Sequence, residues 1–511
     1  MIPFHAPGST AVMSNSTTPG PRVTLLGLDF GSTTSSALVA TARLDASSPV
    51  GRRALADPQP VYRPDPVFTP FAGERVDADR VAALIDGWLA ESGLDPDSLF
   101  SGGAIVTGLA AQADNAESLR QLVRDRLGEA VVAVADDPCL ESWLAFMASA
   151  AALSRAEPER PVLNLDIGGG TTNSALGVNG NVVSTGCHFI GARHFRFRAG
   201  TFELEATSRW GAALAADRRI KAEPGRTLTP SEVAQLVGYY IEALERLVAG
   251  SPPPDEAASL ANLHEQVPLD FPPHCQPVIT FSGGVGELIY RRQSGEPWPE
   301  LTAFGDLGVL LAERVCQSPL LSRDLRTVVP EHGGRATLVG LSLYQTEISG
   351  STLFLPDPAR LPLHDLPVVG TLSLDADSAE IAAALALVAH SLRGACLQIS
   401  SSHGRADDSR SPARAVLTAP RRQAERVKSF ARRLSAAWAA APIPGELPLV
   451  LLVAENSAHA LGNYATGWGR EPFNLTVIDE VPMRDAQFVS IGRPAAGVVP
   501  VRYHGLSRSP L

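Results

Sequence analysis

The feature that most constrains the fold of this chain is a motif that occurs twice. An apolar strand ends in Asp-x-Gly, hydroxyl residues follow, and a second apolar run begins. The first copy reads LDFGSTTSSALV at residues 28–39, and the second reads LDIGGGTTNSALG at residues 165–177. Each copy predicts a strand, a tight turn and another strand. The repetition predicts two related lobes rather than a repeat protein of short period.

Both turns offer the chemistry of a phosphate site. A carboxylate at the end of a strand lies beside a tight loop whose backbone N–H groups point outward, and Mg²⁺ prefers one or two carboxylates together with water and phosphate oxygens. We therefore predict that Asp29 and Asp166 hold Mg²⁺ for one bound nucleotide. A single Asp-x-Gly turn would be weak evidence, because it also occurs as a simple turn. The predicted nucleotide-binding residues are Asp29, Gly31, Ser32, Thr33 and Thr34 in the first turn and Asp166, Gly168, Gly169, Gly170, Thr171 and Thr172 in the second.

A third glycine turn adds to this pattern. An apolar run at 278–281 leads into Gly283 and Gly284, where a backbone without side chains can lie flat against a planar ligand such as adenine or ribose. The three turns, in this order and at these separations, resemble the phosphate 1, phosphate 2 and adenosine motifs of the actin, Hsp70 and sugar-kinase superfamily. The sequence contains neither G-x-x-x-x-G-K-[ST] nor a complete G-x-G-x-x-G at this turn. ATP and Mg²⁺ are therefore the expected cofactors.

The candidates for the catalytic carboxylate lie between the two motifs. In this superfamily the helix between the lobes places a carboxylate near the attacking water, and Asp137 and Glu141 fit that position. Asp137 precedes Pro138, so it could instead only cap the helix that begins at the proline. Glu141 could likewise only complement the helix dipole. The sequence leaves both alternatives open.

The composition is that of an ordinary globular protein. The 511 residues are 45% hydrophobic, with a formal net charge of −11 and a pI near 5.5, which argues against a nucleic-acid partner along the whole chain. Five cysteines without a C-x-x-C pair fit a reducing cytoplasm. No apolar run reaches the roughly 18 to 20 residues that a membrane span needs. Residues 1–20 lack the features of a secretion signal and are expected to form a disordered leader.

The expected organisation is an α/β fold with two actin-like, duplicated ribonuclease-H-like lobes and an additional C-terminal α/β region. We predict the first lobe at residues 21–160, the second at 161–355 and the C-terminal region at 356–511, after a proline-rich stretch. An Asn-Gly pair at 179–180 predicts a type I′ hairpin. The predicted helices cover residues 78–92, 116–127, 138–154, 230–249, 305–316, 378–393 and 419–440.

Alternating basic and aromatic residues at 193–198 permit two interpretations. The run RHFRFR could form a nucleic-acid or partner surface. A solvated strand whose alternate phenylalanines are buried is favoured, because side chains alternate between the two faces of a strand.

From about residue 22 to 508 the chain resembles the ethanolamine ammonia-lyase reactivating factor family. The most specific segment is TVIDEVPMRDAQFVSIGRPAAGVVPV at 476–501, because a generic actin-like ATPase has nothing like it. Two departures are Ser32, where a threonine is expected, and residues 136–138, where Gly-Pro is expected, so the identity of the water-activating residue is in doubt. The other segments that carry the resemblance are NLDIGGGTTNSAL at 164–176, VITFSGGVGELIYRR at 278–292, FGDLGVLLAE at 304–313 and RATLVGLSLYQTEISGSTLFL at 335–355.

The resemblance implies a molecular chaperone for an adenosylcobalamin enzyme that damages its own cofactor. With ATP and Mg²⁺, such a protein would release spent cobalamin from ethanolamine ammonia-lyase so that intact adenosylcobalamin can enter. Its ATP hydrolysis would serve reactivation rather than metabolic catalysis. The expected partner is the lyase, without nucleic acid or membrane, and the expected location is the cytoplasm. Whether the protein forms a homo-oligomer or associates with a bacterial microcompartment is left open.

Two other functions stay open on the sequence. A sugar or polyol kinase of the same superfamily would place an aspartate base and an acceptor pocket in the cleft. An actin-like scaffold protein would bind nucleotide in order to polymerise or dock. The C-terminal residues beyond 355 favour the reactivating factor over both.

Overall fold

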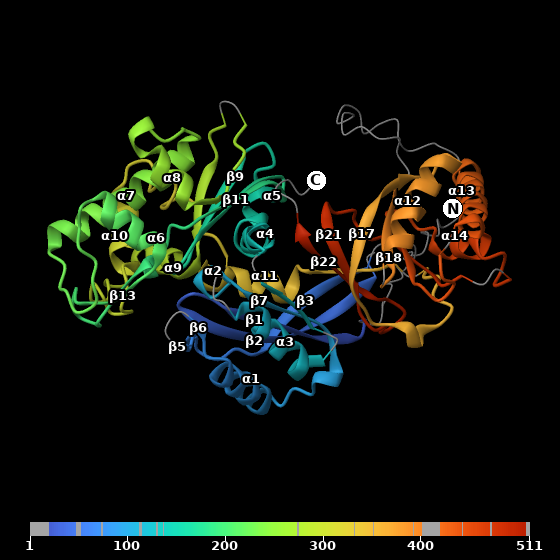
Figure 1. Cartoon of the computed structure of the whole chain (residues 1–511), viewed down its shortest axis with the longest axis horizontal. Coiled ribbons are helices and arrows are strands. Elements are labelled where there is room, and N and C mark those ends of the chain that lie inside the picture. The colour runs from blue at the N-terminus through green and yellow to red at the C-terminus, as the bar shows by residue number, and fades with distance from the viewer. Residues whose placement is uncertain are drawn as a thin grey trace, which may run out of the picture.

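Three large β-sheets with their covering helices hold successive parts of the chain (Figure 1). The computed structural model describes residues 20–506, apart from 47–52, 73–74, 112–114, 129–130, 136, 273–274, 332, 351, 392, 401–419, 442 and 471–472. Residues 1–19 of the predicted leader therefore lie outside the described residues. None of the described helices is both long and apolar enough to cross a bilayer.

The first sheet is built around a buried central strand. Its strand order is β3-β2-β1-β7-β8, and β1 pairs antiparallel with β2 and parallel with β7. Helices α1 (Ala78–Ser92) and α3 (Ala116–Leu127) cover one face, where Ile85, Trp88 and Leu119 join the apolar side chains of β1. Both helices have their predicted bounds. The strands are β1 (Arg22–Phe30), β2 (Thr34–Ala46), β3 (Arg53–Tyr62), β7 (Leu99–Val106) and β8 (Val131–Ala135).

The second sheet repeats the central arrangement of the first. Its order is β14-β11-β10-β9-β15, with β9 antiparallel to β10 and parallel to β15. Asn179 and Gly180 both have positive φ, as a type I′ hairpin requires. The repeated order confirms the predicted fold of two related lobes. The elements are β9 (Val162–Ile167), β10 (Thr172–Val178), β11 (Asn181–His188), β14 (Glu265–Val267) and β15 (Val278–Ser282), with α7 (Pro230–Ala249), α9 (Gly283–Gln293) and α10 (Gly308–Gln317) contributing to the core on one face.

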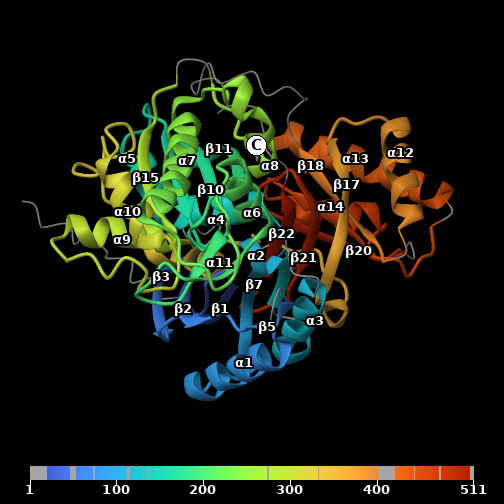
Figure 2. The same cartoon turned by 60° about the vertical axis from the view of Figure 1, so that its left-hand side comes forward.

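The two lobes exchange a helix. α4 (Pro138–Ser149) follows the first sheet in sequence but packs against β9, β10 and β11 of the second. α11 (Ala336–Leu343) follows the second sheet but packs against β1, β2 and β7 of the first, on the side opposite α1 (Figure 2). The helices cross at Gly340, where a Cβ atom would overlap the carbonyl oxygen of Leu144. Each lobe is therefore completed by a helix from the other part of the sequence.

The third sheet carries the predicted C-terminal α/β unit. Its order is β16-β22-β21-β17-β18-β19-β20, and the strands from β17 to β20 are parallel. β16 belongs to this sheet although it precedes the predicted boundary at 355, because it pairs with β22 near the chain's end. The elements are β16 (Thr346–Ile348), β17 (Leu363–Ser373), β18 (Ala395–Ser400), β19 (Leu449–Val453), β20 (Leu475–Asp479), β21 (Ala486–Ile491) and β22 (Pro500–Leu506), with α12 (Ser378–His390), α13 (Pro420–Ala440) and α14 (Ala458–Ala465).

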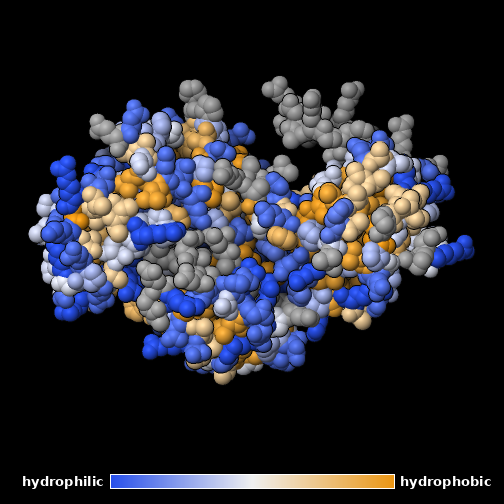
Figure 3. Space-filling view, in the orientation of Figure 1, coloured by the Kyte–Doolittle hydropathy of each residue, from blue (hydrophilic) through white to orange (hydrophobic). Residues whose placement is uncertain are grey.

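The C-terminal unit is joined to the first lobe through buried polar contacts. Arg502 of β22 is fully buried and donates from Nη1 to the Gly102 carbonyl of β7 at 2.8 Å. The hydroxyls of Ser101 and Thr346 lie 2.6 Å apart. Polar residues cover most of the face shown in Figure 3, with apolar residues gathered over the C-terminal unit. The unit is thus packed on the lobe rather than linked to it by a free connector.

Three predicted helices differ in their bounds, each for a local reason. The helix expected at 138–154 is divided at Ala150 into α4 and α5 (Ala151–Ala156), and the Ser149 hydroxyl donates to the Ala145 carbonyl, a contact that bends helices. The helix expected from 305 begins at 308, where the Asp306 side chain accepts from the Gly308 N–H. The helix expected to 393 ends at 390, before the left-handed Gly394.

The short elements complete the fold. In β12 the side chains of Phe195 and Phe197 are buried and Arg196 between them is half-buried, which confirms that the alternate phenylalanines are buried but not that the strand is solvated. The others are β4 (Val67–Phe68), β5 (Phe71–Ala72), β6 (Arg75–Val76), α2 (Gly108–Ala111), β12 (Phe195–Phe197), β13 (Leu204–Thr207), α6 (Arg209–Asp217) and α8 (Ala258–His264).

Gly340→Ala tests the crossing of α4 and α11. The added methyl would meet the backbone of Leu144, which has no room to give, so we expect a loss of about 1–3 kcal/mol in the free energy of unfolding. Gly87→Ala is the matched control, because Gly87 lies in α1 with nothing within 4 Å of a Cβ position. That substitution should stabilise by up to about 1 kcal/mol through helix propensity. Denaturant unfolding of both variants measures the contrast, and equal stabilities would contradict the close crossing.

Candidate functional site

The two Asp-x-Gly turns have the same internal geometry and face one another. The N–H of Gly31 donates to the Thr34 carbonyl at 3.0 Å, and the N–H of Gly168 donates to the Thr171 carbonyl at 2.9 Å. A Cβ at Gly169 would overlap the hydroxyl of Thr33. The first turn, residues 29–34, is therefore in direct contact with the second turn, residues 166–172.

Asp29 and Asp166 end the central strands of their sheets, and burial raises the pKa of each. The pKa of Asp29 is raised to about 7 by burial and by the Asp166 charge, against a lowering hydrogen bond from Thr107. The Thr107 hydroxyl lies 3.3 Å from Asp29 Oδ1. Burial raises the pKa of Asp166 to about 6, although the hydroxyls of Ser282, at 2.5 Å, and Thr337, at 3.4 Å, favour its charged form.

Glu141 is the third carboxylate of this group. Burial raises its pKa well above the ordinary value, and the charges of Asp166 and Asp29 raise it further. A hydrogen bond with the Asn173 side chain acts in the opposite direction. Glu141 is one turn inside α4 and 9% exposed. A cation beside these three carboxylates would favour their charged forms.

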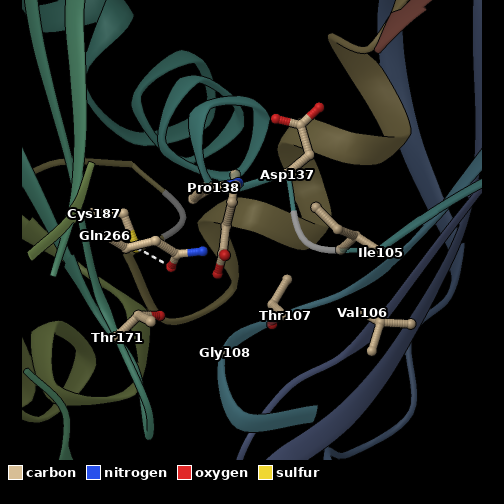
Figure 4. A pocket seen from close by; sticks show the side chains of 10 residues that line it. Ile105, Val106, Thr107, Gly108, Asp137, Pro138, Thr171, Cys187 and Gln266 are labelled. Atoms are coloured by element: carbon tan, nitrogen blue, oxygen red, sulfur yellow. Dashed lines mark hydrogen bonds between the residues drawn. The ribbon is translucent and has the colours of Figure 1, made fainter. Parts of the chain in front are cut away.

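Asp137, one turn earlier on α4, is engaged by backbone donors instead. Its Oδ1 accepts from the Leu140 N–H at 3.0 Å as the helix N-cap, and its Oδ2 accepts from the Gly505 N–H of β22 at 2.8 Å. Figure 4 shows its carboxylate pointing away from Thr171 and Gln266. Asp137 thus caps α4, and it also fixes the last strand to this helix.

The third turn joins the same site through β15. Ser282, at the end of β15, donates to Asp166, and Gly283 follows with φ of 76°. A Cβ at Gly283 would lie 2.6 Å from the Ile167 carbonyl, so glycine allows α9 to begin directly against the second turn. Gly284 has nothing within 4 Å of its Cβ position, which leaves space for a ligand beside it.

The cavity between the first lobe and α4 is small in this arrangement. It measures about 10 Å³ and its lining includes Thr107, Glu141 and Thr171 (Figure 4). Such a volume holds about one water molecule. The cavity is too small for a nucleotide.

Some of the predicted site residues line the cavity, and others support the turns around it. Of the predicted residues, Asp137, Glu141 and Thr171 line the cavity. Asp29 and Asp166 do not line it, and the Thr172 hydroxyl donates to the Ile190 carbonyl at 2.8 Å and supports the second turn. Ser32 and Thr33 contact the opposite lobe. The sequence predictions missed the side-chain partners of the carboxylates, which come from β7, β10, β15 and α11: Thr107, Asn173, Ser282 and Thr337.

The donor set fits a hard cation. The described residues hold no group of three or more Asp, Glu, His or Cys side chains arranged to bind a metal ion by themselves. Mg²⁺ needs only one or two carboxylates when phosphates and waters supply the remaining ligands. Asp29 and Asp166, at facing strand ends, can supply that number.

Comparison with known proteins gives a match over nearly the whole chain. Residues 22–507 match the family described as ethanolamine utilisation protein EutA. The ethanolamine ammonia-lyase reactivase EutA of Salmonella typhimurium is 31% identical, over 94% of this chain and 98% of its own length, and that of Escherichia coli is 29% identical over the same shares.

Solved structures are more distantly similar. A Ppx/GppA family protein of Aquifex aeolicus has a TM-score of 0.35 and 13% identity, covering 63% of this chain and 96% of its own. The ethanolamine utilization protein EutJ of Carboxydothermus hydrogenoformans has a TM-score of 0.28 and 15% identity, covering 64% and 90%.

Asp29→Asn tests the buried carboxylate group through the pH dependence of stability. The pKa of Asp29 is higher in the folded than in the unfolded chain, so its ionisation destabilises the fold as pH rises from about 4 to 7. The variant should therefore gain stability over the wild type by an amount that grows across this range, to roughly 4 kcal/mol. Denaturant unfolding at several pH values without divalent cations measures the gain.

The exposed Asp79 supplies the control for that experiment. Asp79→Asn makes the same change at an exposed side chain of α1, so it separates the effect of burial from that of the substitution itself. Addition of Mg²⁺ should reduce the gain of the Asp29 variant, because the cation stabilises the charged carboxylate that the variant lacks. A gain that falls as pH rises would contradict the burial of Asp29.

Proposed function

Because this chain belongs to the ethanolamine utilisation protein EutA family, we propose that it is an ATP-dependent reactivating factor for ethanolamine ammonia-lyase. It would release damaged cobalamin from the lyase so that intact adenosylcobalamin can bind. The observation that carries this proposal is the group of three buried carboxylates, two at facing turns and one on α4, in a chain similar over 94% of its length to named reactivases. The five free cysteines suit a cytoplasmic location.

The residues of the site have separable roles in this proposal. Asp29 and Asp166 would hold Mg²⁺ with the phosphates, while the backbone N–H groups of the two turns bind phosphate oxygens. Gly283 and Gly284 would lie against the adenosine. When bound, Mg²⁺ would neutralise part of the negative charge of the phosphates.

Glu141 is the carboxylate that we propose as the general base for water. It lines the cavity beside Thr171, and burial, together with the charges of Asp166 and Asp29, holds its pKa well above the ordinary value. A raised pKa suits proton abstraction near neutral pH once a cation offsets those charges. Asp137 lines the same cavity one turn away but already accepts backbone hydrogen bonds from Leu140 and Gly505. Its role in this proposal is structural.

Coupling to the lyase would follow from opening and closing of the two lobes. A ligand shifts a conformational equilibrium only by its difference in affinity for the two states. Bound phosphates would favour one distance between the two turns. A change in that distance would reach both sheets through α4 and α11, because each of these helices packs against one sheet and against the other helix. The lyase would be bound differently in the two states.

The decisive assay uses the lyase directly. Ethanolamine ammonia-lyase is inactivated with cyanocobalamin and then incubated with this protein, ATP, Mg²⁺ and adenosylcobalamin. We expect recovery of ammonia release that depends on ATP, with the sample without nucleotide as control. Recovery equal to that control would reject the proposal. Phosphorylation of an added sugar or polyol at a rate equal to ATP consumption would instead favour a kinase, and nucleotide-dependent sedimentation would favour a scaffold.

Glu141→Gln and Asp137→Asn separate the two candidates on α4. Loss of a general base typically costs about 100- to 10,000-fold in rate, so we expect Glu141→Gln to lower ATP hydrolysis at least 100-fold while Mg-ATP still binds. Asp137→Asn should have a smaller effect on hydrolysis, because the amide oxygen can still accept from Leu140 N–H. Phosphate release and nucleotide titration measure the two quantities. A larger loss of hydrolysis in the Asp137 variant would reverse the assignment.

A further inference from the structure

Arg193 is anchored on the second turn by its backbone. It lies in a short 3-10 helix, Ala192–His194, whose N–H groups at Ala192 and Arg193 donate to the carbonyls of Gly168 and Gly169 at 3.1 Å and 2.6 Å. A Cβ at Gly169 would lie 3.3 Å from the Arg193 Cβ. The Arg193 side chain therefore starts at the edge of the predicted phosphate cradle.

The side chain of Arg193 crosses to the first lobe. Its guanidinium carbon lies 5.5 Å from the centre of the Phe68 ring. Phe68 pairs with Thr34 in the sheet, and the next residue, Thr69, donates from its hydroxyl to the Gly31 carbonyl at 2.7 Å. Phe68 is thus part of the segment that flanks the first turn. The guanidinium lies between the two lobes, beside both turns.

The guanidinium is half-buried and one of its donors is unused. Its Nη1 atom is inaccessible and has no hydrogen-bond partner among the described residues. Burial and the charge of Arg196 lower the pKa of Arg193, while the charges of Asp306 and Glu205 act in the opposite direction. The ring that it contacts is itself 58% exposed. A guanidinium has five N–H donors suited to planar oxyanions, and the unused Nη1 can donate to one.

We propose that Arg193 binds the terminal phosphate oxygens of the bound nucleoside triphosphate, leaving Phe68 when the nucleotide enters. This inference rests on the proposed nucleotide site and adds a residue to it. The side chains of Asp29, Asp166 and Glu141 repel a triphosphate when they are charged. Arg193, which is held on the second turn and faces Phe68 of the first lobe, supplies the opposite charge. The contact with Phe68 would hold the guanidinium at the site while no phosphate is bound.

The test compares nucleotides that differ in their phosphates. Binding of Mg-ATP and AMP is measured by calorimetric titration for the wild type, Arg193→Met, Arg193→Lys and Arg198→Gln. Loss of a charge-assisted hydrogen bond weakens binding by about 10- to 100-fold, which we expect for Mg-ATP with Arg193→Met. AMP affinity should change less than about threefold, because AMP lacks the terminal phosphates. Arg193→Lys keeps the positive charge without the paired donors. Its affinity for Mg-ATP should therefore lie between those of the wild type and Arg193→Met.

Controls make the outcomes distinct. Arg198 lies on the same segment but is exposed and paired with Glu203 at 2.8 Å, so its variant should bind both nucleotides as the wild type does. Unchanged Mg-ATP binding by Arg193→Met, or equal loss for ATP and AMP, would overturn the role of Arg193 while the nucleotide site stands. A wild-type protein that binds no Mg-ATP would overturn both.

Discussion

The crossing of α4 and α11 is the contact on which the rest of the structure depends. Neither lobe is complete from its own continuous stretch of sequence, because each takes one helix from beyond its own sheet. Gly340 brings the two helix backbones close, so they pack as one unit between the sheets. Any movement that separates the first turn from the second must bend about this crossing. The same crossing places Glu141, on α4, beside Asp29 and Asp166.

The electrostatics of the cleft follow from that arrangement. Burial of three carboxylates near one another is unfavourable in the absence of a cation, and the raised pKa values of Asp29, Asp166 and Glu141 express this cost. The cavity lined by Glu141 is too small for a nucleotide, and the two turns are in contact. A cation beside the carboxylates would relieve the charge repulsion among them.

The sequence predicted the turns and their aspartates because those signals are local. A strand, an aspartate and glycines lie within about ten residues, and the repetition of that pattern indicated two lobes. The partners of the aspartates, such as Thr107 and Thr337, lie far away in sequence and no local pattern connects them. Asp137 and Glu141 were both candidates on the sequence, and four residues place both near one face of a helix. The structure distinguishes them by their partners, which are backbone donors for Asp137 and the other carboxylates for Glu141. Helix exchange was likewise hidden, since apolar periodicity does not say which sheet a helix covers.

The last strand of the chain has a consequence for synthesis. β22 supplies the Gly505 N–H that completes the cap interactions of Asp137, and its Arg502 satisfies the Gly102 carbonyl inside the first lobe. During translation the first sheet emerges early, yet α11 and β22 follow only after several hundred further residues. Domains of most chains fold as they emerge. Here the contacts of α11 and β22 with the first lobe can form only after most or all of the chain has been made.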